Sequence, residues 1–428
     1  MGWILIFALQ AVENWPQWRG PQGNGYSAQA DPPVEWSETK NVRWKVEIPG
    51  SGCATPAVWG DRIFVLTAID TKKDAKGAAP KPASPRGEQG MSTGTPTTVH
   101  RFEVLCLDRA TGKTVWSRTA AEEVPHEGHH PSHGYASASP ATDGKILIVS
   151  FGSRGIFAYD LEGNLKWKRD LGDMKIKVGF GEGISPVLHG GSVFVNWDHE
   201  GESFIACLDA TTGEPKWRQA RDEKTTWTTP FVVEHAGATQ VVVNGTKRTR
   251  SYDPATGKLL WECGGQGMNA IPVPVAREGL VYCMTGYRGF SLLAIRLDSK
   301  GDVTDSAQVA WKRTDAAPYV ASPLLAGDLL YFTKERQGFL SCVDAKTGEP
   351  KFGPERLPGI DTIYASLAGA AGKVYVVGRS GTTLVLKQGP TFEVLATNVL
   401  SEGIDASPVL VGKELYLRGS KSLYRIEK

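Results

Sequence analysis

Short apolar runs separated by polar turns follow one another along the chain. In residues 322–352 (SPLLAGDLLYFTKERQGFLSCVDAKTGEPKF), a Ser-Pro pair leads into one apolar run, and a Gly-Asp pair precedes the next, at 329–332. A third run at 339–343 ends in Asp-Ala-Lys-Thr-Gly, and a short fourth run carries Phe352. Alternating apolar residues between tight Gly- and Asp-containing turns are typical of β-strands, and nothing here recurs at helical spacing. We therefore predict a four-stranded antiparallel meander.

The same plan recurs about every forty residues. Each copy starts after a Ser or Thr, and the starts are Pro56, Pro140, Pro186, Pro230, Pro272, Pro323, Leu367 and Pro408, with Ile271 in place of the Ser or Thr before Pro272. The fourth-strand aromatics are Trp116, Trp167, Trp217, Trp261, Trp311 and Phe352, with Phe392 a poorer match in the seventh copy. The first interval, of 84 residues, holds a single closing Trp. It is therefore one copy with an insertion, and the chain contains eight copies.

The eighth copy ends at Ile426 without a fourth strand, and the start of the chain can supply the missing one. Residues 42–48 (VRWKVEI) alternate as a strand, and Trp44 matches a fourth-strand aromatic. An open array would expose two sheet edges, whereas this strand can close a ring. We predict an all-β fold, a single eight-bladed β-propeller over residues 42–428, closed by an N-terminal strand that completes the last blade.

Three segments lie outside the regular repeat. Residues 1–13 hold a short apolar run, at 3–12, that suits the hydrophobic part of a secretory signal with cleavage near Ala11, or else a buried strand. Residues 14–41 form an irregular arm, whose three Trp we expect to pack across the body. Residues 70–98, rich in Lys, Pro, Gly and Ala, are predicted to be a disordered insertion in the first blade. The signal-like run leads us to expect a periplasmic or secreted protein, and no other stretch is long and apolar enough for a transmembrane helix.

Bulk charge points to no particular partner. The chain has 48 Lys and Arg against 46 Asp and Glu, a net charge of +2, which predicts neither nucleic-acid nor membrane-surface binding. Only the distribution of charge over the surface can identify a charged partner.

The units LDRATGKTVW, LDATTGEPKW and YDPATGKLLW, each preceded by a Ser/Thr-Pro pair, resemble the repeat of quinoprotein-type eight-bladed β-propellers. That family includes pyrroloquinoline quinone (PQQ)-dependent alcohol dehydrogenases and the β-propeller lipoprotein of outer-membrane protein assembly. The leader WPQWRGPQGNG, with FGEGISPVL downstream, resembles exported propellers of planctomycete-type bacteria. The resemblance spans residues 42–428 and implies the fold; because one fold hosts enzymes and scaffolds, it implies no single function.

For the enzymes of this family, the resemblance implies PQQ bound against a disulfide of adjacent cysteines, with calcium beside a catalytic Asp. None of the six cysteines here are adjacent in sequence, so PQQ with calcium is an alternative by resemblance only, and we assign neither a cofactor nor a metal. Cys106, Cys207 and Cys342 take the same third-strand place in non-neighbouring blades, too far apart for disulfides, and we interpret them as small core residues.

Four histidines, His126, His129, His130 and His133, lie in the segment PHEGHHPSHGY that ends at Tyr135. A solvated loop accounts for them most simply. The alternatives are a metal or proton-transfer site, because imidazoles are common ligands, or contact with a ligand in the propeller mouth through His133 and Tyr135.

Basic residues recur in the turns between second and third strands, which share one face of a propeller with the blade-to-blade linkers. They are Arg154, Lys247, Arg248, Arg288, Lys334, Arg336, Arg379, Arg418 and Lys421, and only the third blade, with Asp198, Glu200 and Glu202, lacks one. We call this the mouth face. The hypothesis is that Arg154, Lys247, Arg288, Arg336 and Arg379 bind an anionic partner there. Solvated surface charges are the alternative.

We call the Ser or Thr before the start of each copy its anchor. The residue two positions before each anchor differs from copy to copy, although the surrounding repeat is constant. These residues are Cys53, Ser137, Gly183, Trp227, Asn269, Val320, Tyr364 and Asp405. They lead into the innermost strands beside the central channel, where closed β architectures commonly bind ligands. Trp227, Asn269, Tyr364 and Asp405 combine stacking surface with hydrogen-bonding groups and are the candidate ligand site; steric filling of the channel is the alternative. Asp405 has no evident catalytic partner, so no catalytic residue is assigned.

These observations favour an exported, monomeric, non-catalytic propeller that binds a protein or an anionic polysaccharide through its basic face. Two alternatives stay open: a PQQ-dependent alcohol or sugar dehydrogenase, and a hydrolase or lyase acting on anionic sugars.

Overall fold

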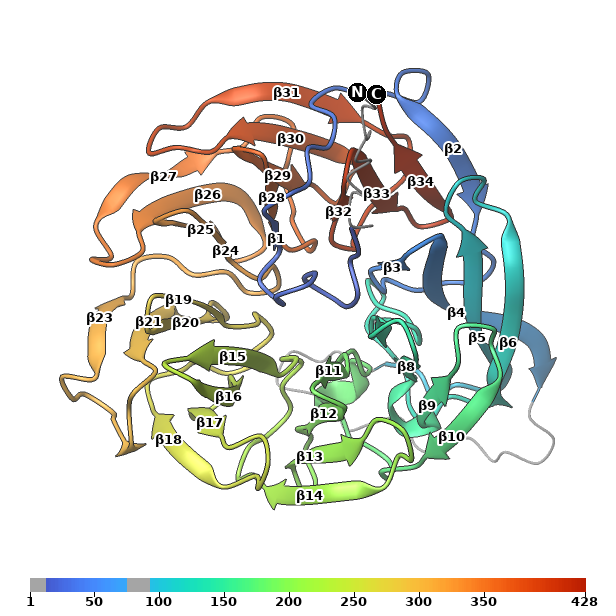
Figure 1. Cartoon of the computed structure of the whole chain (residues 1–428), viewed down its shortest axis with the longest axis horizontal. Coiled ribbons are helices and arrows are strands. Elements are labelled where there is room, and N and C mark those ends of the chain that lie inside the picture. Colours follow the sequence, from blue (N-terminus) through green and yellow to red (C-terminus); the bar gives the residue numbers. More distant parts are fainter. Residues whose placement is uncertain (1–12, 75–92) are drawn as a thin grey trace, which may run out of the picture.

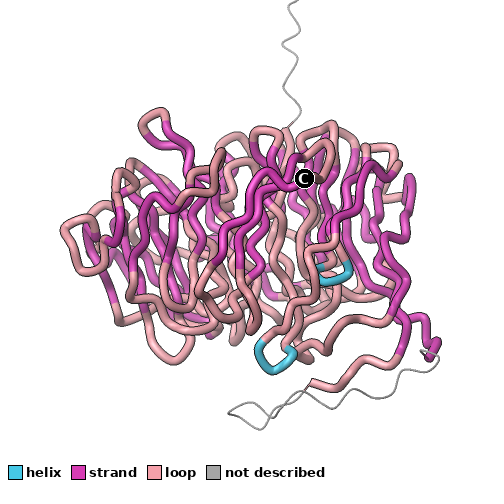
Figure 2. Tube along the Cα trace, turned by 90° about the horizontal axis from the view of Figure 1, so that it is seen from below, coloured by secondary structure: helices cyan, strands magenta, loops and turns pink. Residues whose placement is uncertain are grey.

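The computed structural model describes residues 13–74 and 93–428, and these residues form eight sheets arranged in a ring (Figure 1). In each sheet, four antiparallel strands follow one another from the central channel to the rim. Seen from the side, the ring is a thick disc (Figure 2). The predicted eight-bladed β-propeller is confirmed.

The strands of each blade are given from the centre outward. Blade 1 has β3 (Ala57–Trp59), β4 (Arg62–Asp74), β5 (Thr98–Asp108) and β6 (Thr114–Glu123); blade 2 has β7 (Ala141–Thr142), β8 (Leu147–Ser150), β9 (Ile156–Tyr159) and β10 (Leu165–Arg169). Blade 3 has β11 (Val187–His189), β12 (Ser192–Trp197), β13 (Phe204–Asp209) and β14 (Pro215–Ala220); blade 4 has β15 (Phe231–His235), β16 (Ala238–Val243), β17 (Thr249–Tyr252) and β18 (Leu259–Cys263). Blade 5 has β19 (Val275–Arg277), β20 (Leu280–Thr285), β21 (Ser291–Arg296) and β23 (Val309–Arg313); blade 6 has β24 (Leu324–Ala326), β25 (Leu329–Lys334), β26 (Gln337–Asp344) and β27 (Pro350–Arg356). Blade 7 has β28 (Ala368–Ala370), β29 (Lys373–Val377), β30 (Thr382–Lys387) and β31 (Val394–Val399); blade 8 has β32 (Val409–Val411), β33 (Glu414–Arg418), β34 (Ser422–Ile426) and β2 (Val42–Glu47).

The ring is closed by strand β2 from the beginning of the chain. It pairs antiparallel with β34, placing Lys45 opposite Tyr424, and so supplies the fourth strand of blade 8. Trp44 packs against Tyr416 of the same blade, with ring centroids 5.9 Å apart. The predicted closure is confirmed, and it leaves neither end of the array as a bare sheet edge.

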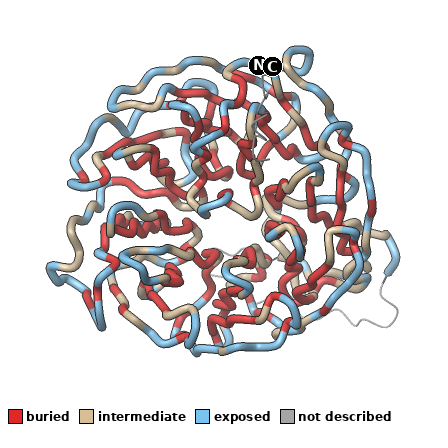
Figure 3. The backbone as a smooth tube through the Cα atoms, in the orientation of Figure 1, coloured by how far each residue is buried: buried red, intermediate tan, exposed pale blue. Residues whose placement is uncertain are grey.

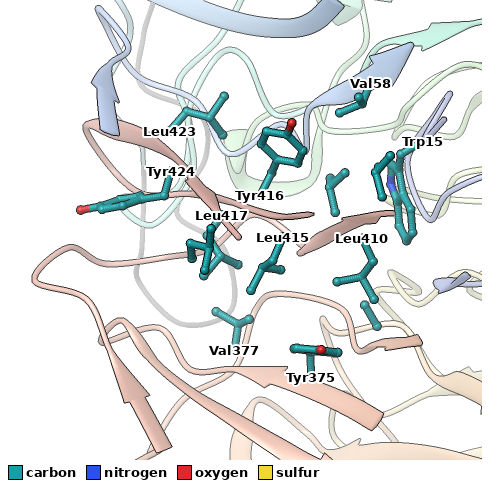
Figure 4. Packing of buried hydrophobic residues seen from close by; sticks show 14 of the residues in the cluster. Trp15, Val58, Tyr375, Val377, Leu410, Leu415, Tyr416, Leu417, Leu423 and Tyr424 are labelled. Atoms are coloured by element: carbon teal, nitrogen blue, oxygen red, sulfur yellow. The ribbon is translucent and has the colours of Figure 1, made fainter. Parts of the chain in front are cut away.

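The apolar cores lie between adjacent blades. Middle strands are buried on both faces, whereas the outermost strands alternate buried and exposed residues, so burial falls from the centre to the rim (Figure 3). At the closure, Tyr416 and Leu415 of β33 pack near Tyr375 of blade 7 on one side and Val58 of blade 1 on the other (Figure 4). The ring therefore consists of equivalent blade-to-blade contacts rather than one central core.

At five of these contacts in the described structure, a recurrent Trp of one blade covers a turn Gly of the next blade. Trp167 donates from Nε1 to the carbonyl of Ala210 in the next blade at 2.9 Å, and its ring covers Gly213, which has φ 72°. A Cβ on Gly213 would lie 2.6 Å from the indole, so a side chain is excluded there. Equivalent pairs are Trp44 with Gly112, Trp116 with Gly163, Trp217 with Gly257 and Trp311 with Gly348. Trp261 differs and donates to Gln240, because blade 5 has a longer turn that contains β22 (Gly301–Asp302), a short parallel addition to blade 4.

The Ser/Thr anchors form a second set of contacts around the channel. Each anchor hydroxyl accepts a hydrogen bond from a backbone N–H of the preceding blade. The donor–acceptor pairs are Thr55–Ser139, Ser139–Ser185, Ser185–Thr229, Val273–Ser322, Ser322–Ser366, Ser366–Ser407 and Ser407–Thr55, at 2.8–3.1 Å. The chain of bonds is interrupted at Ile271, which has no hydroxyl. These bonds give the Ser/Thr of the repeat a structural role.

Residues 14–41 cross the end of the channel opposite the mouth face. Trp15 exchanges two backbone hydrogen bonds with Val58 of blade 1, each 2.8 Å long, and its side chain is buried. Arg19 is also buried and donates to the carbonyls of Asn24, Pro323 and Leu367, the last two in blades 6 and 7. Farther along, β1 (Tyr26–Ser27) pairs in parallel with β28. The arm thus joins blades on opposite sides of the ring.

Two details differ from the sequence-based expectation. Strand β4 continues to Asp74, and Asp70 pairs with His100, so the first residues of the expected 70–98 loop are strand; residues 75–92 lie outside the described part. Phe392 precedes β31 and packs edge-to-face against Phe352, with 5.8 Å between ring centroids, so it is not a fourth-strand aromatic. The predicted signal at 1–13 lies almost entirely outside the described residues. Within residues 13–74 and 93–428, no helix has the length and apolar character needed to cross a membrane.

Candidate functional site

A cavity of about 840 Å³ opens on the mouth face and follows the channel inward. We call it the mouth pocket. It is lined by Trp18, Cys53, Thr55, His130, Ser132, His133, Ser137, Ser139, Phe180, Gly183, Ser185, Trp227, Ile271, Gly286, Tyr287, Arg288, Tyr319, Val320, Glu335, Arg336, Thr362, Tyr364, Arg379, Asp405 and Ser407. Apart from Trp18 of the arm, the residues come from linkers before the innermost strands and from turns between second and third strands, because these two kinds of segment meet at the mouth.

One wall of the mouth pocket, from blades 5 to 7, combines arginines with tyrosines. The Arg379 guanidinium lies 4.4 Å from the ring centroid of Tyr364, and Arg336 Nη1 donates to Tyr364 Oη at 3.3 Å. Arg288 lies over the Tyr287 ring at 5.4 Å, and Tyr287 packs on Tyr319 at 4.8 Å. Cation–π contacts hold the guanidinium groups of Arg288 and Arg379 against these rings.

Asp405 borders the same wall. Its Oδ1 lies 3.1 Å from Arg379 Nε, close enough for charge attraction, but no hydrogen bond to Oδ1 forms among the described residues. Burial raises the pKa of the carboxyl, and Arg379 opposes that shift. Oδ1 itself is buried against Arg379, whereas the Asp405 side chain as a whole is 19% exposed, so a ligand in the pocket reaches Asp405 through its exposed part.

The opposite wall contains the histidine segment. His130 Nδ1 and Ser132 Oγ are 2.6 Å apart, and Ser132 Oγ donates to Tyr364 Oη at 3.4 Å, which links the two walls. Burial lowers the pKa of His130 and lowers that of His133 to about 4. Both imidazoles are therefore neutral at neutral pH. The segment is an ordered part of the pocket wall rather than a solvated loop, as His130 also binds the Phe180 carbonyl through its backbone N–H at 3.0 Å.

Trp227 presents part of its indole to the pocket. Nε1 donates to the carbonyl of Gly181 at 2.8 Å, and the backbone N–H donates to Ala270 at 2.9 Å. The second bond spans the blade 4 to blade 5 junction at which Ile271 interrupts the anchor hydroxyls. The ring orientation is consequently fixed from both ends.

The arm forms the floor of the mouth pocket. Trp18 Nε1 donates to the anchor hydroxyl of Ser407 at 3.3 Å, and Thr55, Ser139 and Ser185 line the same depth. Hydroxyl groups and one indole therefore face a ligand that reaches the bottom.

Seven of the eleven predicted site residues line the mouth pocket: His133, Trp227, Arg288, Arg336, Tyr364, Arg379 and Asp405. Four do not. Asn269 is buried and hydrogen-bonds Tyr319, whose pKa is raised by burial, so it supports a wall residue. Tyr135 and Arg154 border a smaller, adjoining cavity, and Lys247 lies 3.5 Å from Asp222 on the surface.

The predicted ring of basic residues is reduced to an arc over blades 5 to 7. Arg154 is held by Glu123 at 2.7 Å and Asp173 at 3.2 Å. Arg248 lies 2.7 Å from Asp302. Arg418 is buried and donates to a backbone carbonyl at 2.9 Å. Neighbouring carboxylates and burial thus remove much of the positive potential from the other blades.

The acidic turn of blade 3 also has a structural explanation. Asp198 is fully buried and accepts from Arg221 Nε at 2.7 Å and from Nη2 at 3.0 Å. This bidentate pair fills the junction between blades 3 and 4, so Asp198 contributes no charge to the mouth face.

The smaller cavity, of about 30 Å³, contains two carboxyl groups behind the histidine wall. Glu182 accepts from the Ser153 N–H at 2.7 Å and from its hydroxyl, and Glu127 accepts from the Ile176 N–H at 3.1 Å. Burial raises the pKa of Glu182 to about 7, and burial together with the Glu182 charge raises that of Glu127 to about 8.

Several pocket residues were not predicted. They are Trp18, Phe180, Tyr287, Tyr319 and Glu335, whereas His130 belongs to the predicted histidine segment. Tyr287 and Glu335 directly precede predicted arginines, and Tyr319 lies three residues before an anchor. Including the neighbours of each predicted position would therefore have identified them. Trp18 has no such signal because the arm does not repeat.

Fold and repeat together define a PQQ-repeat β-propeller. A family model described as outer membrane protein assembly factor BamB matches residues 100–352, more than half of the chain, and the chain belongs to this family. No curated protein matches its sequence significantly.

Solved structures with the same fold include BamB, a designed protein and an alcohol dehydrogenase. BamB from Moraxella catarrhalis is 15% identical, with a TM-score of 0.53 over 85% of this chain and 100% of that chain. The computationally designed Ika8 protein is 13% identical, with a TM-score of 0.52 over 77% and 93% of the two chains. The quinohemoprotein alcohol dehydrogenase ADHIIG from Pseudomonas putida HK5 is 11% identical, with a TM-score of 0.62 over 97% and 80%. At these identities the likeness shows the fold alone.

The mouth pocket does not suit a calcium ion beside PQQ. Calcium takes six to eight oxygen ligands, largely from carboxylates. Among residues 13–74 and 93–428, no three His, Cys, Asp or Glu side chains are grouped closely enough to hold a metal. Asp405 faces Arg379 instead, and all six cysteines are free thiols. The side chains of the mouth pocket therefore differ from the calcium ligands and the cysteine pair that the resemblance to PQQ-dependent dehydrogenases implies.

Proposed function

We propose that this protein is an exported, non-catalytic β-propeller that binds a protein or an anionic polysaccharide partner through its mouth pocket. The observation that carries the proposal is the wall of Arg288, Arg336 and Arg379, which directs three guanidinium groups and their tyrosine partners at one cavity. Arginine held against aromatic rings is well suited to bind carboxylate or sulfate groups.

The family to which the chain belongs supports a binding role. BamB, whose family model the chain matches, is described as an assembly factor. A binding protein of the same architecture is therefore the simplest function for this chain.

Export is supported by the apolar run at residues 3–12. Mass spectrometry of the protein recovered from the periplasm or medium should show a chain that starts near Glu13. Recovery of a full-length chain only from the cytoplasm would contradict export.

The binding proposal is tested with purified monomer against panels of acidic glycans, acidic peptides and their neutral counterparts. Binding should be selective for anions and weaken with salt, because exposed charges are screened. The triple variant R288E/R336E/R379E should lose anion binding. The control K247E/K421E reverses charges on equivalent turns outside the pocket and should retain anion binding. An unchanged profile in the triple variant, with native circular dichroism, would overturn the proposal, as would chromatographic evidence that the recovered ligand has been cleaved.

A further inference from the structure

The mouth pocket holds acceptors as well as cations. Glu335 and Asp405 line it beside the three arginines. A ligand with a dense run of negative charge would be repelled by these two carboxylates. A ligand with an isolated negative charge and several hydroxyl donors would satisfy both kinds of group.

Asp405 gives this preference a specific group. Its Oδ1 is buried and ion-paired with Arg379 Nε at 3.1 Å, but the side chain as a whole is 19% exposed and lines the pocket, so a ligand can reach the carboxylate. A sugar hydroxyl can donate to a carboxylate, whereas a carboxylate or sulfate ester has no proton to donate at neutral pH. Asp405 therefore favours a hydroxylated ligand.

Aromatic rings and hydroxyls make up most of the remaining lining. Trp227, Tyr319 and Tyr364 present flat surfaces fixed by hydrogen bonds or ring contacts. The C–H face of a sugar ring can pack on such surfaces while its hydroxyls reach polar groups. At the floor, the Ser407 hydroxyl accepts from the Ser366 N–H and the Thr55 hydroxyl accepts from the Ser407 N–H, and each hydroxyl has a proton of its own to donate.

The shape of the pocket selects a chain end. The arm crosses the far end of the channel, and Trp18 closes the floor against Ser407. A cavity of 840 Å³ falls in the range of small-molecule sites and holds about two or three sugar rings. A polymer can therefore enter by its terminus but cannot thread through the ring.

From these features we infer that the mouth pocket recognises the terminal residues of a uronate-containing oligosaccharide. The uronate carboxylate pairs with Arg336 and Arg379, a ring hydroxyl donates to Asp405, and the ring stacks on an aromatic side chain. This inference rests on the proposed function and specifies the partner of the same site.

Isothermal titration calorimetry with trigalacturonate tests it, using the full chain. The matched probe is the methyl ester of the same trimer, which keeps the rings and removes the charge. R336Q and D405L should each weaken binding of the trimer about tenfold or more, the effect of one charge-assisted hydrogen bond. K247Q removes a charge at the equivalent turn of blade 4 and should change affinity by less than about twofold. Circular dichroism establishes that each variant is folded.

Two further probes separate the classes of anion: a disulfated disaccharide and a tetraglutamate peptide. Tighter binding of the trimer than of its ester, the disaccharide or the peptide supports the inference. Three results would overturn the inference: equal binding of the ester, tighter binding of the sulfated or peptide probe, or unchanged affinity in both R336Q and D405L. None of these results would contradict the proposed anion-binding function. If no anionic probe binds at all, the proposed function fails as well.

Discussion

At the scale of single residues, two carboxyl groups behind the pocket wall are held where ionisation is unfavourable. Glu182 ties the loop at Ser153 to the segment that carries Gly181, and Gly181 in turn accepts the indole bond of Trp227. Glu127 holds the backbone at Ile176. Their pKa values, raised to about 7 and about 8, mean that both change charge near neutral pH.

We predict that stability falls as pH rises across this range. A carboxyl whose pKa is about 8 when folded, against an ordinary 4.5, binds more protons in the folded state. The free energy of unfolding therefore decreases between these two pH values. Thermal unfolding in a pH series at constant ionic strength should show the midpoint falling, and E127Q should flatten the slope. E355Q, exposed on β27, is the control and should keep the wild-type slope; a wild-type slope in E127Q would contradict the assignment.

At the scale of elements, the Ser/Thr anchors hold neighbouring innermost strands together. Ser366 accepts from the Ser322 N–H at 2.9 Å and is buried, so water cannot replace it. The bonds run between blades and add to the Trp–Gly contacts nearer the rim. Among the described residues, five of the eight blade junctions therefore have both contacts, and the junction of blades 4 and 5 has neither.

Removing one anchor should expose the contribution of these bonds. S366A leaves the Ser322 N–H buried without an acceptor, which costs about 1–3 kcal/mol in the free energy of unfolding. Denaturant-induced unfolding of S366A measures this loss, and S420A, on an exposed turn, should lie within about 0.5 kcal/mol of wild type. Equal stability of the two variants would show that the anchor bonds do not hold the blades together.

How much the sequence can predict differs between elements that repeat and elements that do not. The closure of the ring could be predicted because blade 8 lacks a fourth strand and an unpaired strand with Trp44 lies near the start of the chain. Bare sheet edges are unfavourable, so the two are expected to pair. Trp227, Tyr364 and Asp405 could be predicted as pocket residues because each lies two residues before an anchor, at a position that differs from copy to copy while the surrounding repeat is constant. Lys247 was misplaced because its ion pair with Asp222 depends on the path of a neighbouring linker, which no period reveals.

At the scale of the whole molecule, the arm decides whether the channel is a passage or a pocket. It contacts Val58 in blade 1, Pro323 in blade 6 and Leu367 in blade 7, and so spans the ring. Arg19 is the central contact, since its guanidinium binds carbonyls from two blades and from the arm itself. Burial lowers its pKa to about 9, which still leaves it charged at neutral pH.

Breaking this contact should release the arm while the ring stays closed. R19L leaves the carbonyls of Asn24, Pro323 and Leu367 without their donor, and we expect a loss of about 3 kcal/mol or more in the free energy of unfolding. Limited proteolysis followed by mass spectrometry should then show rapid cleavage within residues 14–36 before any cleavage in the blades, because β2 still pairs with β34. R43L, on an exposed position of β2 beside Glu427, is the matched control and should resist cleavage like the wild type. If the arm of R19L is cut no faster than that of R43L, Arg19 does not hold the arm across the channel, and the floor of the mouth pocket depends on other contacts.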